Sequence, residues 1–404
     1  MKLSTSLVNL AARAASINIT GNKLITVPSS EPPFSKALDP LLASFSLEFQ
    51  YWPKYAGNAT GHPNEYVNQL LANLGQRVGK SPAIRVGGTS ENTAYVDTSF
   101  QLWNSSQIQE VFGPFTQRSN TSIGRDWYKI AGDLPAGTEF TFGLNLYNES
   151  EVATQTKMLA DAFYGSGANI TKNVSLKFIQ VGNEPNFYFP TAAEYVAHWI
   201  PLAETVMKNI KMGGEEYPTF WIGSDAFGFG GFTLTGTLEA GILENQNINS
   251  QSYGKSYWLG EANTYAAEAI FGQSNTAESA IWTVDYMLHA ASMGIERVYL
   301  HSTPNRLFSV FQPGWGFTNG TGIERPHIMP TYNGLLVVNE MVGTSGTSKI
   351  AEIENANENI ASYGVWDHGK LARLAVINSE VYDQTTINRP ALNVILSGGY
   401  MEKH

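Results

Sequence analysis

The chain has 404 residues, of which 43% are apolar, 12% aromatic and only 15% charged, which predicts a globular protein with a large core and excludes a disordered or coiled-coil chain. Its net charge of −10, with no basic stripe in the sequence, argues against nucleic acid as a partner. Because it has no cysteine, disulfides, thiolate catalysis and cysteine-bound metals are excluded.

The N-terminus indicates secretion. Residues 1–15 have a basic start and a small-residue end, the pattern of a weak signal peptide that Asn9 and Arg13 interrupt. N-x-S/T glycosylation sequences point the same way, although coincidence in an Asn-, Ser- and Thr-rich chain is the alternative. Their asparagines are Asn18, Asn58, Asn104, Asn120, Asn148, Asn169, Asn173 and Asn319. The sequence has no apolar run of about 18 residues, so we expect no membrane-spanning helix.

From residue 31 to residue 345, strand patterns alternate with helical patterns, which predicts a parallel sheet, open or closed. The expected strands are 43–49, 83–86, 139–144, 176–181, 220–223, 257–260 and 297–300. The expected helices are 62–76, 151–163, 192–209, 235–243 and 276–293, the last one stopped by Gly294.

After residue 345 the pattern changes. Short strands at 350–353, 361–365, 371–377 and 392–396, with turns and no helices between them, predict a second, antiparallel domain over 346–404. Residues 16–30 alternate in the same way, so we expect them to pair with this domain, a partial β-sandwich.

Two glutamates occupy equivalent places. Glu184, in GNEP, follows the strand at 176–181, and Glu261 follows the strand at 257–260. Because the carboxyl ends of all barrel strands open on one face, both acids are expected in one site. Glycoside hydrolysis needs such a pair, about 5 to 5.5 Å apart for retention and about 6.5 to 9.5 Å for inversion. The alternative for each is a carboxylate that caps a helix N-terminus.

Residues near these acids fit the same chemistry. The amide of Asn183 is able to donate a hydrogen bond to a sugar hydroxyl. The alternative is that Asn183 is only a hydrogen-bonded residue of the turn. Arg85, at the end of the second strand, is a candidate partner that keeps Glu261 ionised, or else a structural arginine.

Five ordered motifs resemble the fungal β-glucuronidases of glycoside hydrolase family 79, relatives of heparanase within the superfamily of retaining (β/α)8-barrel glycosidases. The motifs are FSLEFQYWPKYAGN (45–58), AIRVGGTSENTAYVD (83–97), FIQVGNEPNFY (178–188), YWLGEANTY (257–265) and AIWTVDYMLHAASMGIERVYLH (280–301). The resemblance covers residues 40 to 345 and implies a TIM-type barrel.

The resemblance also implies roles. Glu184 would be the general acid/base and Glu261 the nucleophile, with no metal or organic cofactor. Glu48 would contact hydroxyls of the glucuronate ring; the alternative is that Glu48 is a solvated acid at the rim of the barrel. Tyr265 would contact the same sugar, or else only pack against neighbouring side chains. Glu184 then needs a raised pKa, for which the aromatic residues at 187–189 are expected to supply desolvation.

The chain departs from the family in three places. Between the strands at 220–223 and 257–260 there is too little chain for a sixth strand and its helix, so the barrel is expected to lack this unit. Phe308 stands where a tyrosine hydroxyl is expected to bind the sugar carboxylate, a loss that Arg306 is able to offset by charge. The C-terminal domain is shorter than in the family.

These patterns predict a secreted, retaining exo-β-glucuronidase that acts on a carbohydrate, with no nucleic acid or membrane partner. One alternative is an endo-acting, heparanase-like hydrolase, which the acidic net charge disfavours. The other is a catalytically impaired sugar-binding relative.

Overall fold

The computed structural model describes residues 19–102, 121–212, 218–221, 254–264, 269–314, 325–353, 359–379 and 391–397. Seven strands form one sheet in the order β11-β10-β9-β6-β3-β13-β12, and every neighbouring pair is parallel. They are β3 (Ala43–Glu48), β6 (Ile84–Gly87), β9 (Glu139–Leu144), β10 (Ser175–Val181), β11 (Phe220–Trp221), β12 (Trp258–Ala262) and β13 (Arg297–Ser302). This is the strand order of a (β/α)8 barrel and confirms the expected fold class.

In the part of the chain that the structure describes, β11 and β12 are the two edges of the sheet. Residues 222–253, which include the expected helix at 235–243, lie outside the described residues, so the lack of a sixth unit stays a prediction. Aromatic rings from both edges nevertheless meet: Trp221 and Trp258 are 5.5 Å apart between ring centroids. Tyr299 of β13 and Phe178 of β10 join them at 5.0 and 4.9 Å, so the inside of the barrel is packed.

The main helices follow barrel strands. They are α3 (Glu65–Val78), α4 (Glu149–Tyr164), α6 (Ala192–Asn209), α8 (Ala277–Ser292) and α9 (Pro330–Val342). Local signals set their ends: the side chain of Asn148 accepts from the backbone N–H groups that begin α4, and Gly294, at φ +91°, follows the end of α8. Helix α9, with Pro330 in its first turn, was not predicted from the sequence.

Shorter elements fill the connections. They are η1 (Phe49–Tyr51), α2 (Trp52–Ala56), β4 (Gly57–Ala59), β5 (His62–Pro63), η2 (Thr89–Thr93), β7 (Tyr95–Val96), β8 (Ser122–Ile123), η4 (Lys129–Asp133), α5 (Ala168–Thr171), η5 (Pro185–Phe187), β14 (Phe311–Gln312) and β15 (His327–Ile328).

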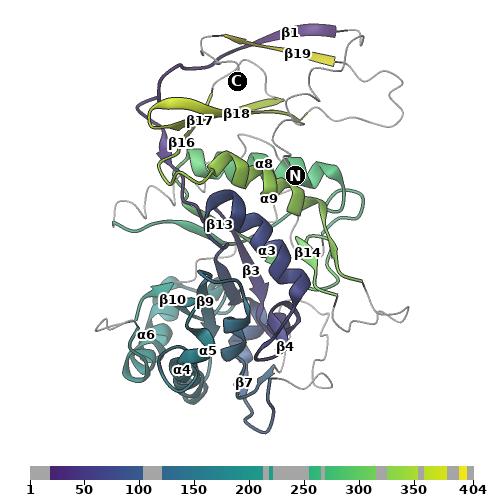
Figure 1. Cartoon of the computed structure of the whole chain (residues 1–404). Helices are drawn as coiled ribbons and strands as arrows, with labels where there is room; N and C mark the ends of the chain where they lie inside the picture. Colours follow the sequence, from purple (N-terminus) through teal and green to yellow (C-terminus); the bar gives the residue numbers. More distant parts are fainter. Residues whose placement is uncertain are drawn as a thin grey trace.

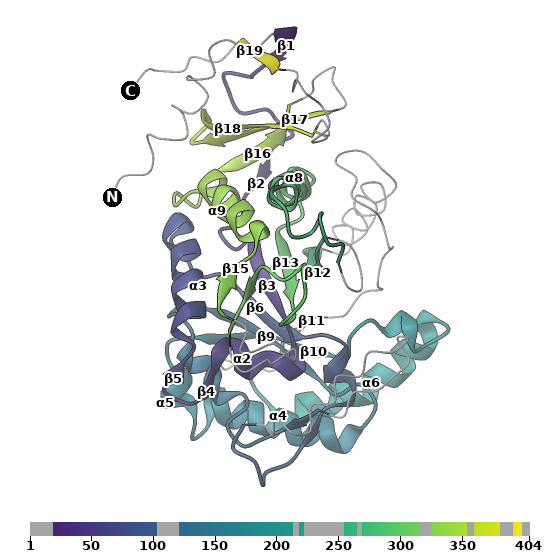
Figure 2. The same ribbon diagram turned by 90° about the vertical axis from the view of Figure 1, so that its right-hand side faces the viewer.

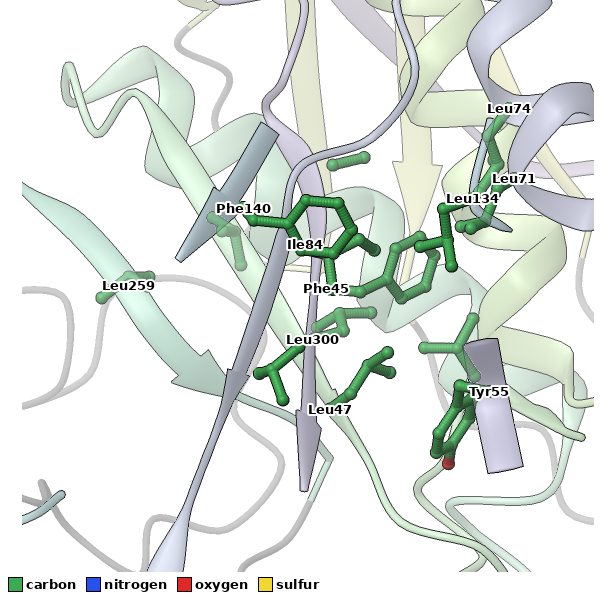
Figure 3. Packing of buried hydrophobic residues seen from close by; sticks show 14 of the residues in the cluster. Phe45, Leu47, Tyr55, Leu71, Leu74, Ile84, Leu134, Phe140, Leu259 and Leu300 are labelled. Atoms are coloured by element: carbon green, nitrogen blue, oxygen red, sulfur yellow. The ribbon is translucent and has the colours of Figure 1, made fainter. Parts of the chain in front are cut away.

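One large core joins the sheet to the helices around it. Figure 3 shows part of it, with Phe45 and Leu47 of β3 beside Ile84 of β6 and Leu300 of β13. All four side chains are at most 2% exposed. Since burial of such a side chain contributes about 1.5 to 3 kcal/mol, this packing fixes the strands whose ends carry the polar residues described below.

A smaller β-structure lies beyond α8 and α9 (Figures 1 and 2). An antiparallel sheet has the order β18-β17-β16-β2, and a second pair joins β1 to β19. These strands are β1 (Ile19–Thr26), β2 (Lys36–Ala37), β16 (Lys349–Glu352), β17 (Ile360–Asp367), β18 (Lys370–Asn378) and β19 (Ala391–Ser397). The β1/β19 pair is parallel, so the expectation of antiparallel pairing was wrong for it. Because β1 and β19 come from opposite ends of the chain, no short hairpin connects them, and nothing in the connection requires them to pair antiparallel.

Buried polar contacts attach this β-structure to the barrel helices. Tyr363 of β17 donates a hydrogen bond of 2.8 Å to Asp285 of α8, and both residues are buried. Arg373 of β18 donates to the carbonyls of Met341 and Val342, at the C-terminus of α9. Helices α8 and α9 therefore contact both the barrel strands and the smaller β-structure. None of the helices in the described residues is both long and apolar enough to cross a bilayer.

Candidate active site

Arg85 is the centre of a polar cluster at the carboxyl ends of the barrel strands. It comes from β6 and is 3% exposed. Its guanidinium donates from Nη1 to Ser46 and Glu261, both at 2.8 Å, from Nε to Gln180 at 2.7 Å and from Nη2 to Asn183 at 2.6 Å. Arg85 thus ties β3, β12 and the end of β10 together, and the expectation that it partners Glu261 is confirmed.

A β-bulge on β12 turns Glu261 towards Arg85. Leu259 pairs with Val298 and Ala262 with Leu300, so three steps along β12 match two along β13. Strict alternation would put Glu261 on the same side as Leu259, but the extra residue in the bulge re-aims it into the barrel. Gly260 is needed there because a Cβ at this position would lie 2.5 Å from Cζ2 of Trp221.

Glu184 follows β10 in a strained turn. Its φ of +45° lies in the left-handed region, where a residue with a Cβ is rare and costs energy. The preceding Gly182 also has a positive φ, +79°, and Gln180 donates to its carbonyl at 2.9 Å. Since Gln180 also accepts from Arg85, the turn that carries Glu184 is fixed to the same guanidinium as Glu261.

Asn183 links the two catalytic candidates. Its Oδ1 accepts from Arg85, and its Nδ2 donates to Oε2 of Glu184 at 3.2 Å. Its backbone exchanges hydrogen bonds with the side chain of Asn92: Asn183 N donates at 2.7 Å, and Asn183 O accepts at 3.1 Å. The accepted bond from Arg85 fixes which end of the amide is the donor, so Nδ2 faces Glu184.

Glu48, at the end of β3, is held from two sides. Its Oε1 accepts from the backbone N–H of Ser90 at 3.0 Å and from the Ser90 hydroxyl, and its Oε2 lies 3.3 Å from Nε2 of His301. Gly88, at φ +119°, passes so close to the Glu48 carboxylate that a Cβ there would collide with it. Glu48 is therefore a fixed member of the cluster and not a solvated rim acid.

His301, at the end of β13, was missed from the sequence. The residue is 7% exposed, and its Nδ1 lies 3.0 Å from Ser46 Oγ and 3.7 Å from Oε1 of Glu261. Burial opposes the charged ring, but Glu261 and Glu48 outweigh it, and the pKa of His301 is raised. The available signal was a histidine at the carboxyl end of an otherwise apolar strand.

Glu91 of η2 was missed as well. Its carboxyl is fully buried, and Oε2 accepts from the backbone N–H of Gly88 at 3.1 Å. The Glu91 carboxylate occupies space that a Cβ at position 87 or 143 would need, so both positions are glycine. Burial raises the pKa of Glu91 well above its usual range, while the charge of Arg85 acts in the opposite direction. Glycines inside two adjacent strands were the sequence signal for this close approach.

The two catalytic candidates have opposite pKa shifts. Burial, with the charge of Glu261, raises the pKa of Glu184 to about 7. Burial also acts against ionised Glu261, but His301 and Arg85 outweigh it and lower the pKa of Glu261. One carboxyl is therefore protonated and its neighbour ionised over a range of mildly acidic pH, the division of roles that glycoside hydrolysis requires.

The aromatic residues after Glu184 only partly match the expectation. Tyr188 packs edge-on against Tyr147, and the charge of Glu184 contributes to its raised pKa, so it lies near the acid. Phe187 is 41% exposed, and Phe189 packs on Tyr195 and His198 of α6. Phe189 therefore contacts α6, and the expectation that it helps to desolvate Glu184 stays a prediction.

The remaining expectations concern three residues. Phe308 is buried, with its ring 6.2 Å from that of His301, so it supplies apolar packing and no hydroxyl. The backbone carbonyl of Arg306 accepts from Gln312. Tyr265 lies outside the described residues. Within the described ranges no group of three or more His, Cys, Asp or Glu side chains has the arrangement of a metal site.

Comparisons with known proteins identify relatives. The chain is 27% identical to a β-glucuronidase of Aspergillus niger over 87% of this chain and 74% of the relative, and 25% identical to a β-glucuronidase of Neurospora crassa over 95% and 79%. No protein-family model matches the chain. Among solved structures, it superposes on a 4-O-α-L-rhamnosyl-β-D-glucuronidase of Fusarium oxysporum with a TM-score of 0.65 and 21% identity, covering 90% of this chain and 82% of that one. This structural likeness supports the fold.

Fold, site and relatives define the class: the chain is a glycoside hydrolase. Within that class it is related to fungal β-glucuronidases, as the five sequence motifs implied, and glycoside hydrolase family 79 is consistent with these relatives.

Proposed function

We propose that the chain is a retaining exo-β-glucuronidase that removes terminal glucuronic acid from glycans or glycosides by double displacement. The observation that carries this proposal is the inequality of Glu184 and Glu261: Arg85 donates directly to Glu261 but reaches Glu184 only through Asn183, and the two carboxyls have opposite pKa shifts. Relatives named β-glucuronidase support glucuronic acid as the sugar.

In the first step Glu261 attacks the anomeric carbon while Glu184 gives its proton to the leaving glycosidic oxygen. The bond to the aglycone breaks, and a glycosyl ester of Glu261 forms. In the second step Glu184, now ionised, takes a proton from water, which attacks the same carbon and releases Glu261. Arg85 keeps Glu261 ionised for the first step, and Asn183 offers its amide N–H beside the sugar.

Hydrolysis of an aryl β-glucuronide tests the activity. Proton NMR of the product formed first distinguishes retention, which gives the β-anomer, from inversion, which gives the α-anomer. A Glu261→Gly variant should lose hydrolysis and regain turnover with azide, which takes the place of the missing nucleophile. Faster hydrolysis of the matching aryl glucoside would refute the sugar assignment.

A catalytically impaired, sugar-binding relative is the second candidate, because Phe308 carries no hydroxyl and packs on His301. Calorimetry separates the two functions: glucuronate binding without any hydrolysis favours the impaired relative. Cleavage of a sulfated polymer, with no turnover of the aryl glucuronide, favours an endo-acting enzyme instead.

We also propose that the protein is a secreted glycoprotein. Four of the acceptor asparagines fall in the described residues, and all four are exposed: Asn58, Asn148, Asn169 and Asn173. Enzymatic removal of N-glycans from protein secreted by a fungal host should lower its mass. An unchanged mass would contradict this proposal.

A further inference from the structure

His301 joins two carboxylates that have different tasks. One ring nitrogen, Nε2, lies 3.3 Å from Oε2 of Glu48, and the other, Nδ1, lies 3.7 Å from Oε1 of Glu261. An imidazole donates from both nitrogens only when it carries both protons. With an anionic acceptor beside each nitrogen, the arrangement favours the imidazolium form.

We propose that His301 is a positioning residue that acts as an imidazolium between Glu48 and Glu261, and is the second cation, with Arg85, that holds Glu261 ionised and directed into the site. This inference rests on the proposed roles of Glu184 and Glu261 and adds a residue to them.

Ser46 supports both cations at once. Its Oγ accepts from Nη1 of Arg85 at 2.8 Å and lies 3.0 Å from Nδ1 of His301. A hydroxyl oxygen accepts two hydrogen bonds, so it is able to serve the guanidinium and the protonated ring together. When His301 loses its Nδ1 proton, the hydroxyl of Ser46 is able to turn and donate to the bare nitrogen, so the neutral ring is tolerated but no longer stabilises Glu261.

The charged groups around His301 come from four strands. Glu48 of β3 and Glu261 of β12 favour the charged ring, whereas Arg85 of β6 disfavours it. Glu184, at the end of β10, is itself affected, because the charge of His301 lowers its pKa. Phe308 lies against the ring, and Thr303 Oγ1 lies 3.3 Å from Nε2. Removing the imidazolium therefore raises the pKa of both catalytic carboxyls.

The pH profile of a His301→Gln variant tests this. Gln retains hydrogen-bonding capacity but carries no charge, and an opposite charge within about 4 to 6 Å typically lowers a carboxyl pKa by about 1 to 3 units. Both limbs of the kcat/KM profile on an aryl β-glucuronide should thus move to higher pH, the acidic limb by about 1 unit or more. His198→Gln is the matched control, because the ring nitrogen of His198 contacts the carbonyl of Leu146 and its profile should not move.

If both limbs of the pH profile of His301→Gln stay in place and kcat falls equally at every pH, the proposal is overturned and His301 has a packing role. If the variant does not fold, a measurement on the unsubstituted protein still tests the proposal. In 15N NMR of labelled histidines at pH 6, both ring nitrogens of His301 should be protonated. The His301 signal is assigned by its loss in His301→Gln or in the smaller His301→Asn. A single ring proton at pH 6 would also overturn it. If the enzyme hydrolyses no glucuronide, the proposed function fails, and the protonation state of His301 is still decided by NMR.

Discussion

Arg85 donates a hydrogen bond of 2.8 Å to Glu261 while its other amino group donates to Asn183, whose amide in turn reaches Glu184. One guanidinium therefore contacts the ionised acid directly and the protonated acid through an amide. This connectivity makes the two carboxyl groups chemically unequal.

Replacing Arg85 should disable the site. An Arg85→Gln variant loses the direct counter-charge of Glu261, so the pKa of Glu261 should rise, and kcat/KM should fall by about 10²-fold or more, as when a charged or aligned donor is removed from an active site. Steady-state kinetics on an aryl glucuronide measure this. Arg77→Gln, which breaks a surface ion pair with Glu340, is the control and should keep full activity. Equal kinetics for the two variants would contradict the role of Arg85.

Activity should depend on pH through both carboxyls. The active form has Glu184 protonated and Glu261 ionised, so kcat/KM should fall as pH rises through about 7 and should also fall at acidic pH, below the usual range of a glutamate. Initial rates from pH 3 to pH 9 give the two limbs. A rate that keeps rising above pH 8 would show that Glu184 is not the acid.

Stability should improve when Glu184 is neutralised. The folded-state pKa of Glu184, about 7, lies above its ordinary value of 4.5, so the folded state binds this proton more tightly and stability declines as pH rises from 4.5 through 7. Above pH 7 the ionised group costs up to about 3 kcal/mol, which Glu184→Gln should recover in part. Urea denaturation at pH 8 measures the free energy of unfolding, and the same comparison at pH 4 should show no gain.

The bulge on β12 should tolerate no side chain at position 260. In Gly260→Ala the added Cβ meets Cζ2 of Trp221 at 2.5 Å, so we expect a loss of about 1 to 3 kcal/mol in stability and of most activity, because Glu261 is the next residue. Thermal unfolding and kinetics follow the two effects. The double variant Gly260→Ala with Trp221→Leu relieves the contact and should recover stability; strictly additive losses would mean that the two residues do not meet.

The contact between the β-structure and α8 should matter for stability alone. Tyr363→Phe removes the donor to buried Asp285, which should cost about 1 to 3 kcal/mol while leaving kcat/KM of the folded protein unchanged. Urea denaturation measures the loss. Thr347→Val removes an exposed hydrogen bond of 2.6 Å to Asp367 and should change stability by less than about 0.5 kcal/mol.

Much of the barrel was accessible from the sequence because its signals are local. The strand at 139–144 and the helix at 192–209 agree residue by residue with β9 and α6, since alternation, helical spacing and capping residues act over a few positions. Helix α9 escaped prediction. Its exposed stripe consists of Asn333, Val337 and Glu340, and the apolar Val337 within it weakens the alternation of polar and apolar faces that marks a surface helix.

The sequence by itself determined that two glutamates follow two barrel strands, because the strands and the Gly, Asn and Pro residues that end them are marked locally. Tertiary structure decided what those acids can do. The bulge that turns Glu261 inward depends on register against β13, and the placing of His301 between Glu48 and Glu261 depends on β3, β12 and β13 lying side by side. Such contacts join residues far apart in the chain, so only the pairing and packing of the strands can set the charges that make one acid a proton donor and the other a nucleophile.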